Sequence, residues 1–380
     1  MTKPKLFHIA LFLPSLEGGG AQRITLSLAQ GLLQMEGVKV DIVLGQAQGS
    51  FLKDVPAGVR LINLNRSRML YTILPLARYL RSERPNAMVS ALDYANVAAI
   101  LASILSGTKV RTAAVLHNHL SSALARFSWW KRYIFRLLIR NTHPHAHAVI
   151  VVSCGMAEDA AQITGVPVEH IRVIYNPVID PHLLRRTNDS PNHLWLNTSN
   201  LPVILAIGRL TVQKDFSTLI KAVSLLRNNT PSRLIILGEG EQRKELQTLV
   251  SSLKLKDYVD LPGFMSNPRS FMQHAAVVAL SSRWEALPTV LIEALHCGAR
   301  IVSTDCPCGP SEILAQGKYG RLVPVGDVDR MAQALTEAIN DKSPLPTAES
   351  WQPYLIETSV RQYLDIFGIN THKSIPKSTP

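Results

Sequence analysis

The feature that most constrains the fold is an alternation between short apolar runs and longer segments whose apolar residues recur at helical spacing. Residues 7–13 form an apolar run that leads into three consecutive glycines, residues 21–35 show helical spacing, and residues 38–44 are apolar again. This order is typical of a β-loop-α-β unit. Further apolar runs follow at residues 88–91, 113–116 and 148–152. Because these runs are almost continuously apolar, they predict a parallel sheet that is covered on both faces.

The alternation is interrupted once and then restarts. The interruption contains Asn176-Pro177, Asp180-Pro181 and the polar stretch 186–192, a composition typical of a linker. Apolar runs resume at residues 203–207, 233–237, 259–261, 276–280, 300–304 and 320–324. The chain has 380 residues, which is enough for two domains that each bury a core.

We therefore expect an α/β protein with two doubly wound, parallel-sheet domains of Rossmann-like architecture. The first is expected to cover residues 1–178 and the second residues 179–350. Residues 351–368 are expected to form a last helix that packs back on the first domain, and residues 370–380 a frayed tail.

Charge and cysteine content limit the partners and the compartment. The chain has 40 Lys and Arg against 28 Asp and Glu, a net charge of +12 that attracts phosphate on nucleic acid, anionic lipid or a small molecule. The apolar run at residues 7–13 contains His8 and is too short for a signal peptide, and no membrane-spanning segment is expected. Four cysteines are too few for a disulfide scaffold, so we expect free thiols and a reducing compartment: Cys154, Cys297, Cys306 and Cys308.

Two carboxylates stand out in residues 281–298. Pro288 suits the first position of a helix and Gly298 its end, so Glu285 lies in the loop after a strand and Glu293 about one and a half turns into a short helix. Both carboxylates can then face one ligand crevice. The backbone N–H groups at the start of this helix favour an anion such as a diphosphate. A surface salt-bridge pair is the alternative interpretation of the two residues.

This segment resembles the Glu-x7-Glu signature of retaining family-4 glycosyltransferases with the GT-B fold, and residues 301–312 are also similar to that family. The resemblance covers about residues 5 to 368. Its other matching elements occur in the family's order: Gly18-Gly19-Gly20-Ala21-Gln22, His117-Asn118, Val152-Ser153, Tyr175-Asn176-Pro177-Val178 and Gly208-Arg209, followed by Lys214-Asp215. Gln22 stands where the family usually has Glu, so no role that needs a carboxylate is expected at that position.

The resemblance implies roles for individual residues. Arg209 and Lys214 would hold the donor diphosphate, Glu293 the ribose hydroxyls and Glu285 the hydroxyls of the transferred sugar. His117 would lie near the transferred sugar, and it completes a catalytic set with Arg209, Lys214 and Glu285. The remaining expected donor-binding residues are Gly19, Gly20, Gly208, Leu287, Pro288 and Thr289.

No metal and no cofactor are expected. Asp327-Val-Asp329 matches the Asp-x-Asp string of metal-dependent glycosyltransferases, but Asp327 follows Gly326 at a helix start, where a cap explains it more simply. Alternation along the chain separates the rings of the histidines at 143, 145 and 147, so a zinc site is not expected there. Positive charge from Arg209 and Lys214, together with helix N-termini, would replace Mg²⁺.

Residues 126–140 combine two stripes at helical spacing. The apolar stripe contains Trp129, Trp130, Tyr133, Ile134, Leu137 and Leu138, and the basic stripe contains Lys131, Arg132, Arg136 and Arg140. Such a pattern is typical of a helix at a membrane interface. A helix that packs on the sheet and keeps a solvated basic face fits it about equally well. We favour contact with an anionic membrane, because family members often act on lipid-linked acceptors.

The resemblance implies a retaining, metal-independent glycosyltransferase in cell-surface polysaccharide or lipopolysaccharide assembly. The donor would be a nucleotide sugar bound by the second domain, with a UDP-sugar such as a UDP-N-acetylhexosamine favoured. The acceptor would be a glycan or a lipid-linked glycan bound by the first domain. We expect a cytoplasmic protein that can also bind peripherally to the inner face of the cytoplasmic membrane.

Two alternatives remain open at this point. A basic nucleic-acid-binding α/β protein without enzymatic activity would explain the net charge, but the chain lacks a platform of interleaved basic and aromatic residues, so no nucleic-acid partner is expected. A phosphorylase-like enzyme of the same architecture would need a lysine-bound pyridoxal phosphate, and no motif marks one.

Overall fold

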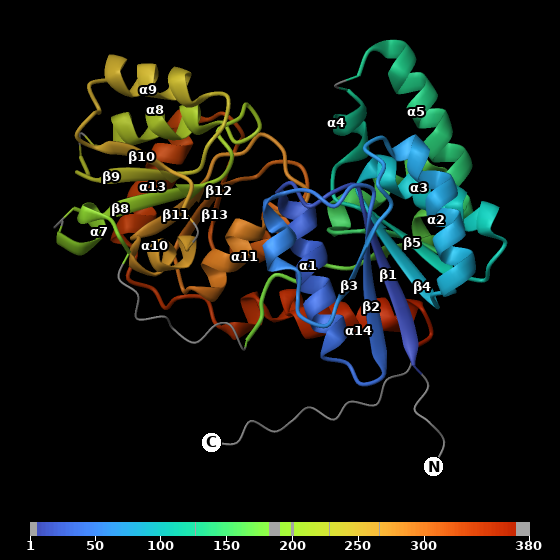
Figure 1. Ribbon diagram of the computed structural model, residues 1–380. Coiled ribbons are helices and arrows are strands. Elements are labelled where there is room, and N and C mark those ends of the chain that lie inside the picture. Colours follow the sequence, from blue (N-terminus) through green and yellow to red (C-terminus); the bar gives the residue numbers. More distant parts are fainter. Residues whose placement is uncertain are drawn as a thin grey trace, which may run out of the picture. The chain divides into compact units, whose positions relative to one another are not determined.

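A computed structural model describes residues 6–125, 127–181, 191–198, 201–227, 229–265 and 267–369. The chain divides into two compact units (Figure 1). The first consists of the chain up to Val178 together with the segment from Tyr354 onward, and the second is Ile179–Pro353. Three parts discussed above lie outside the described residues: Arg126, residues 186–190 of the polar stretch 186–192, and the expected tail at 370–380.

The first unit is built on a parallel sheet in the order β3-β2-β1-β4-β5-β6-β7. Its strands are β1 (Phe7–Leu13), β2 (Val38–Leu44), β3 (Arg60–Asn63), β4 (Ala87–Ala91), β5 (Arg111–Leu116), β6 (Ala148–Val151) and β7 (Ile171–Val173). The apolar pattern predicted neither β3 nor β7. Both are short and lie at or near an edge of the sheet, where polar and half-buried positions replace the continuous apolar run of a central strand.

Helices cover both faces of this sheet (Figure 1). They are α1 (Gly20–Leu33), α2 (Met69–Glu83), α3 (Asp93–Ser106), α4 (Leu120–Leu124), α5 (Trp129–Thr142), α6 (Ala157–Thr164) and α14 (Ile356–Ile366). The expected last helix is shorter than residues 351–368, because a 3-10 turn that contains Pro353 precedes it. Helix α14 packs on α1 at Gly31, where an added Cβ would lie only 2.3 Å from Cγ2 of Ile356. Glycine therefore allows the two helix backbones to approach closely.

The second unit has a parallel sheet in the order β10-β9-β8-β11-β12-β13. Its strands are β8 (Val203–Ile207), β9 (Arg233–Leu237), β10 (Val259–Gly263), β11 (Val277–Leu280), β12 (Ile301–Thr304) and β13 (Arg321–Val323). Its helices are α7 (Leu194–Thr198), α8 (Phe216–Leu226), α9 (Arg243–Ser252), α10 (Pro268–His274), α11 (Thr289–His296), α12 (Pro310–Ile313) and α13 (Val328–Asn340). The two parallel sheets with their covering helices confirm the predicted fold class.

Short 3-10 helices complete the described elements: η1 (Ser50–Asp54), η2 (His143–His145), η3 (Cys154–Met156), η4 (Val168–His170), η5 (Ala315–Gly317), η6 (Ala348–Ser350) and η7 (Gln352–Tyr354). The four cysteines are free thiols, as predicted. Within the described ranges, no helix has both the length and the apolar character that a bilayer crossing requires.

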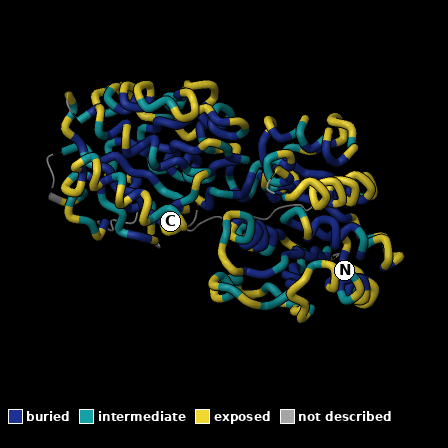
Figure 2. The backbone as a smooth tube through the Cα atoms, turned by 90° about the horizontal axis from the view of Figure 1, so that it is seen from above, coloured by how far each residue is buried: buried dark blue, intermediate teal, exposed yellow. Residues whose placement is uncertain are grey.

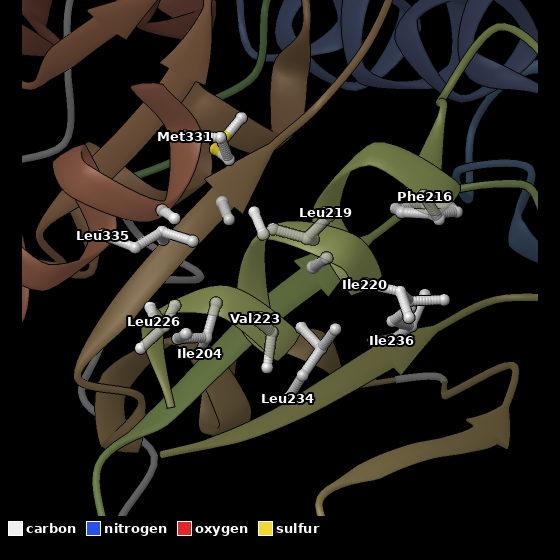
Figure 3. Close-up of a cluster of buried hydrophobic side chains, with 14 of the residues drawn as sticks. Ile204, Phe216, Leu219, Ile220, Val223, Leu226, Leu234, Ile236, Met331 and Leu335 are labelled. Atoms are coloured by element: carbon white, nitrogen blue, oxygen red, sulfur yellow. The ribbon is translucent and has the colours of Figure 1, made fainter. Parts of the chain in front are cut away.

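The core of the second unit lies between its sheet and two helices on one face. Side chains of α8 and α13 pack together over the sheet, and Figure 3 shows Leu219 and Val223 of α8, Ile204 of β8 and Leu335 of α13 in this cluster. Figure 2 shows buried segments inside each unit and exposed segments on its outside. The central strands belong to the buried part, because nearly all of their residues are buried. The buried strands fix the positions of the loops at their ends.

Both sheets reverse their strand order at one point. In the first unit the chain crosses from one side of β1 to the other at β4, and in the second unit it crosses from β8 to β11. Doubly wound sheets bind ligands at the carboxyl ends of the strands beside such a reversal. The loops after β1, β4, β8 and β11 are therefore the positions to search for a site.

Candidate active site

The loop that joins β8 to α8 contains Gly208, Arg209 and Lys214. The aliphatic chain of Lys214 passes over Gly208, because an added Cβ there would lie 3.0 Å from Lys214 Cε. The next loop packs just as closely, since a Cβ at Gly238 would lie 1.9 Å from the carbonyl oxygen of Gly208. The two glycines thus let the loops pack closely together, and Arg209 is exposed.

Lys214 and Glu285 form an ion pair at the reversal between β8 and β11. Lys214 Nζ lies 2.5 Å from Glu285 Oε1, and the hydroxyl of Ser282 donates to the same oxygen at 2.6 Å. Glu285 is only 8% exposed, so its charge is compensated by these two donors rather than by solvent. The structure therefore brings together two of the residues predicted to be catalytic.

Three hydrogen bonds join the loop after β8 to the loop after β11. The Ser281 hydroxyl donates to the carbonyl of Lys214 at 2.8 Å, and the Arg283 N–H donates to the carbonyl of Gln213 at 2.8 Å. The Gln213 amide in turn donates to the carbonyl of Trp284 at 2.9 Å. Both loops are thus held in one conformation around the Lys214–Glu285 pair.

Asp215 anchors the same region from the start of α8. It accepts hydrogen bonds from the hydroxyls of Ser217 and Thr218 and from Arg283 Nε at 3.1 Å. Burial alone would raise the pKa of Asp215, but the hydrogen bonds from these residues lower it below its ordinary value. The sequence motifs include Asp215 and Ser282 only as members of matching segments and assign a role to neither. The contact of Asp215 with Arg283, which lies 68 positions along the chain, ties the start of α8 to the loop after β11.

The second carboxylate lies on α11, close to the predicted position. Pro288 is the N-cap residue rather than the first helical residue, and the helix begins at Thr289, a shift of one position. Glu293 lies in the second turn and is half-buried. Leu287 is buried beneath the helix start, and Gly298 follows the helix end at φ +69°, as its predicted role as a stop requires.

The first unit has its own glycine loop, between β1 and α1. Gly18 has φ +103°, a backbone conformation that favours glycine, and Gly19 caps α1, which begins at Gly20. A Cβ added at Gly20 would meet no atom within 4 Å. The loop thus presents open backbone at the N-terminus of a helix of 14 residues.

His117 directly follows β5 and is half-buried. Burial lowers the pKa of His117 to about 4, so the imidazole is neutral at pH 7. A neutral ring can donate a hydrogen bond from one nitrogen and accept at the other.

Asp93, the first residue of α3 and two residues after the end of β4, is a residue that the sequence motifs did not single out. Burial raises the pKa of Asp93 to about 6, although a hydrogen bond with Asn118 acts in the opposite direction. Its Oδ1 atom is buried and has no hydrogen-bond partner among the described residues. The preceding Leu92 has φ +81°, which is strained for a residue with a branched side chain. An aspartate directly after a buried strand, at the reversal of the sheet, is the signal that would have found it.

Replacing Asp93 with asparagine is expected to stabilise the protein at pH 7.5 by on the order of 2 kcal/mol. The folded pKa of Asp93, about 6, lies above that of an unfolded aspartate. The native state therefore loses stability as the pH rises from about 4 through 6, and the amide removes this loss. Urea unfolding near pH 7.5 and near pH 4 measures the effect. If the free energy of unfolding of the variant exceeds that of the wild type only near pH 7.5, the raised pKa of Asp93 is supported. If the variant is less stable than the wild type at pH 7.5, it is contradicted.

The predicted cap at Asp327 is confirmed, because its carboxylate accepts a hydrogen bond from the N–H of Arg330 at 2.9 Å at the start of α13. A separate set of ligand-type atoms lies in the first unit, from His8, Asp41 and Glu83. The guanidinium of Arg60 binds both carboxylates of that set, at 2.5 Å and 2.6 Å. The carboxylates of Asp41 and Glu83 therefore already bind a cation, the guanidinium of Arg60.

Two Rossmann-like units, each with charged or glycine-rich loops at its strand reversal, define a protein of the GT-B type. Sequence models of two families match the chain, Glycosyltransferase Family 4 over residues 18–180 and Glycosyl transferases group 1 over residues 195–357. Between them they span most of the chain, which belongs to the family-4 glycosyltransferases.

Individual proteins agree with this assignment. The chain is 27% identical over 349 residues to an N-acetylgalactosamine-N,N'-diacetylbacillosaminyl-diphospho-undecaprenol 4-alpha-N-acetylgalactosaminyltransferase of Campylobacter jejuni, covering 88% of this chain and 90% of that one. It is 26% identical over 257 residues to the amylovoran biosynthesis glycosyltransferase AmsD of Erwinia amylovora, covering 67% and 68%. The fold is similar to that of Anabaena Alr3699/HepE in complex with UDP and glucose, with a TM-score of 0.78, 21% identity and coverage of 95% and 99%.

Proposed function

We propose that the protein transfers a sugar from a UDP-sugar, with a UDP-N-acetylhexosamine favoured, to a lipid-linked or oligosaccharide acceptor in cell-surface glycan assembly. The transfer proceeds with retention of configuration and needs no metal ion. The observation that carries the proposal is the Lys214–Glu285 pair, held at the reversal between β8 and β11 beside the exposed Arg209. The names of relatives support it, because one acts on a diphospho-undecaprenol acceptor and a protein of similar fold binds UDP.

In this proposal the bond between the anomeric carbon and the diphosphate oxygen breaks, and the oxygen of the acceptor hydroxyl forms the new bond on the same face of the sugar. The hydroxyl proton passes to the departing diphosphate. Negative charge grows on the departing diphosphate. Arg209 offers a planar fork of donors and Lys214 a point charge, and both stabilise that charge. Glu285 holds the Lys214 ammonium in position and binds hydroxyls of the sugar. The helix start at Pro288 and Thr289 adds backbone donors.

A thermal-shift screen of UDP-, GDP- and ADP-sugars tests the choice of donor. A ligand that binds only the native state stabilises it, by about 2.7 kcal/mol at a concentration of 100 times Kd. We expect UDP and UDP-N-acetylhexosamines to give the largest increase in Tm. An increase with GDP- or ADP-sugars alone would contradict the proposed donor.

Glu293→Ala is expected to weaken binding of the UDP-sugar by about tenfold to a hundredfold, because the ribose hydroxyls lose a charged acceptor worth about 1.5–3 kcal/mol. Isothermal titration measures the affinity. Glu337→Ala on α13 is a suitable control, because Glu337 is a partly exposed carboxylate of the same unit outside the loops of the candidate site. Equal affinities of the Glu293 variant and the wild type would remove Glu293 from the donor site.

We also propose that α5 binds an anionic membrane surface. The helix packs on its own unit through Phe135, Ile139 and Thr142, which are buried. The predicted apolar stripe does not take part in this packing, and its exposed fractions range from 44% to 80%: Trp129, Trp130, Tyr133, Ile134, Leu137 and Leu138. This observation argues against a helix that uses its apolar stripe to pack on the sheet.

The charges on α5 complement an anionic surface. At 3.6 residues per turn, Arg136 and Arg140 flank the exposed apolar stripe on one side and Lys131 flanks it on the other. An interfacial helix buries its apolar face among the lipid headgroups and places flanking cations at the phosphates. Arg132 also has a structural contact, because its guanidinium donates to the carbonyl of Ala125 at the end of α4. It is therefore left unchanged in the test below.

Replacing Lys131, Arg136 and Arg140 with glutamine is expected to reduce binding to phosphatidylglycerol vesicles by at least tenfold, since each charge near the surface contributes about 1 kcal/mol. Binding of the nucleotide sugar should not change. Sedimentation with vesicles measures the effect. Glutamine at three exposed lysines of the second unit is the matched control: Lys221, Lys244 and Lys256. If the α5 variant sediments like this control, α5 is not the membrane contact.

A further inference from the structure

A cavity of about 680 Å³ opens in the first unit at the amino ends of its strands. The loops described above follow the carboxyl ends of the same strands. The lining of the cavity includes Phe7 at the start of β1 and Arg111 at the start of β5. His117 follows the other end of β5, and the six residues of that strand separate the two ends by roughly 17 Å. The cavity is therefore separate from the loops after β1, β4 and β5.

Four cations line this cavity: Arg81, Arg84, Lys109 and Arg111. No carboxylate is among its described lining residues. Glu83, next to Arg84 in sequence, is bound to Arg60 at 2.6 Å instead. Among the residues that the structure describes, none of the four cations forms an ion pair.

Helix ends account for two of the four charges. Arg81 Nε donates to the carbonyl of Ser106 at 3.0 Å, at the end of α3. Arg111 donates to the carbonyl of Phe367, at the end of α14. Cations at these positions stabilise the partial negative charge of a helix C-terminus.

Arg84 and Lys109 are the remaining two. Both are exposed, and neither donates a side-chain hydrogen bond within the described part of the chain. Three helices, α2, α3 and α14, end at this cavity, and each contributes only about half a negative charge. Four full positive charges therefore exceed what the helix ends neutralise, and a concave surface concentrates the excess.

We propose that this cavity is a second binding site, for a ligand that carries a phosphate or diphosphate group. Arg84 supplies a fork of donors for phosphate oxygens and Lys109 a mobile ammonium, while Arg81 and Arg111 add charge from fixed positions. The volume lies in the range of small-molecule sites, about 300–1,000 Å³. The phosphate can belong to a soluble metabolite or to a lipid headgroup.

Chemical protection of Lys109 tests the proposal on the full-length protein. The rate of acetylation of Lys109 by an N-hydroxysuccinimide ester is measured by mass spectrometry, with exposed Lys53 of the same unit as internal reference. Tripolyphosphate, at ionic strength matched with KCl, is expected to slow acetylation of Lys109 about fivefold at four times its Kd, and to leave Lys53 unchanged. Vesicles of phosphatidylglycerol, compared with phosphatidylcholine, form the second arm.

Arg84→Glu is expected to abolish the protection, whereas Arg78→Glu retains it. Arg78 is an exposed arginine on the same helix that does not line the cavity. Protection by tripolyphosphate assigns the site to a soluble phosphorylated ligand, and protection by phosphatidylglycerol alone assigns it to a lipid headgroup. If neither probe protects Lys109, or if Arg84→Glu keeps the protection, the proposal is overturned. The tests of the proposed nucleotide-sugar site use residues and loops of the other unit, so their outcomes are independent of this result.

Discussion

Replacing Lys214 with alanine is expected to slow sugar transfer by roughly 10²–10³-fold, the loss expected for one preorganised donor to a developing negative charge. The ammonium faces the β8–β11 reversal, and its removal also leaves the buried Glu285 without a cation. Both effects act on the reaction, so kcat/KM is the quantity to measure. Arg209→Ala should have an effect of similar size. The wild type should keep its activity in excess EDTA.

The control for Lys214→Ala is Lys221→Ala, which removes an exposed lysine from α8 in the same unit and should change kcat/KM less than twofold. Comparison of the double variant Lys214→Ala, Glu285→Gln with Glu285→Gln alone separates the loss of positive charge from the effect of an uncompensated carboxylate. If EDTA abolishes the activity and Mg²⁺ or Mn²⁺ restores it, the metal-independent mechanism is wrong.

Asp41→Ala is expected to destabilise the first unit by about 3 kcal/mol, the lower part of the range for a broken buried ion pair. Asp41 on β2 is fully buried, and Arg60 binds both of its oxygens, at 3.0 Å and 2.5 Å. Tyr79 donates to it at 2.6 Å and the His8 ring lies at 2.8 Å. The variant leaves these groups without their acceptor, although Arg60 keeps Glu83.

The effect of Asp41 should depend on pH. Burial would raise the pKa of Asp41, but hydrogen bonds from His8, Arg60 and Tyr79 lower it far below its usual range. The stabilisation is therefore complete above the unfolded pKa of about 4 and is lost as the pH falls towards the folded value. Urea unfolding at pH 7 and at pH 3 measures it, with the exposed Asp257→Ala as control. If the free energies of unfolding of Asp41→Ala and the wild type differ by less than about 1 kcal/mol at pH 7, this account is wrong.

Periodicity predicted the central strands closely because they are buried on both faces. The predicted runs at residues 7–13, 38–44 and 203–207 coincide with β1, β2 and β8. It failed at β3, where half-buried and exposed positions alternate over only four residues, and at the start of α14, where a 3-10 turn that contains Pro353 precedes the helix. The apolar pattern of the sequence therefore predicts strands that are uniformly buried, and it is less informative at sheet edges and helix ends.

At the candidate site, too, sequence motifs identify some residues, while the contacts between them depend on the fold. Motifs identified Lys214 and Glu285 separately, but their 2.5 Å contact depends on the adjacency of β8 and β11, which lie far apart in sequence. Asp93 carries no motif, and its unusual environment arises from burial beside Asn118. Conversely, the exposure of the apolar stripe on α5 depends on which face packs inward, and spacing alone left both faces possible.

The most direct test of the proposed site is hydrogen–deuterium exchange of the wild type with and without UDP. The account predicts slower exchange of backbone amides at residues 208–215 and 285–293, which form the loops around the Lys214–Glu285 pair and the start of α11. Exchange at residues 233–237 of the buried strand β9 should not change. If saturating UDP leaves residues 208–215 and 285–293 unprotected, the nucleotide does not bind at these loops and the central claim is wrong.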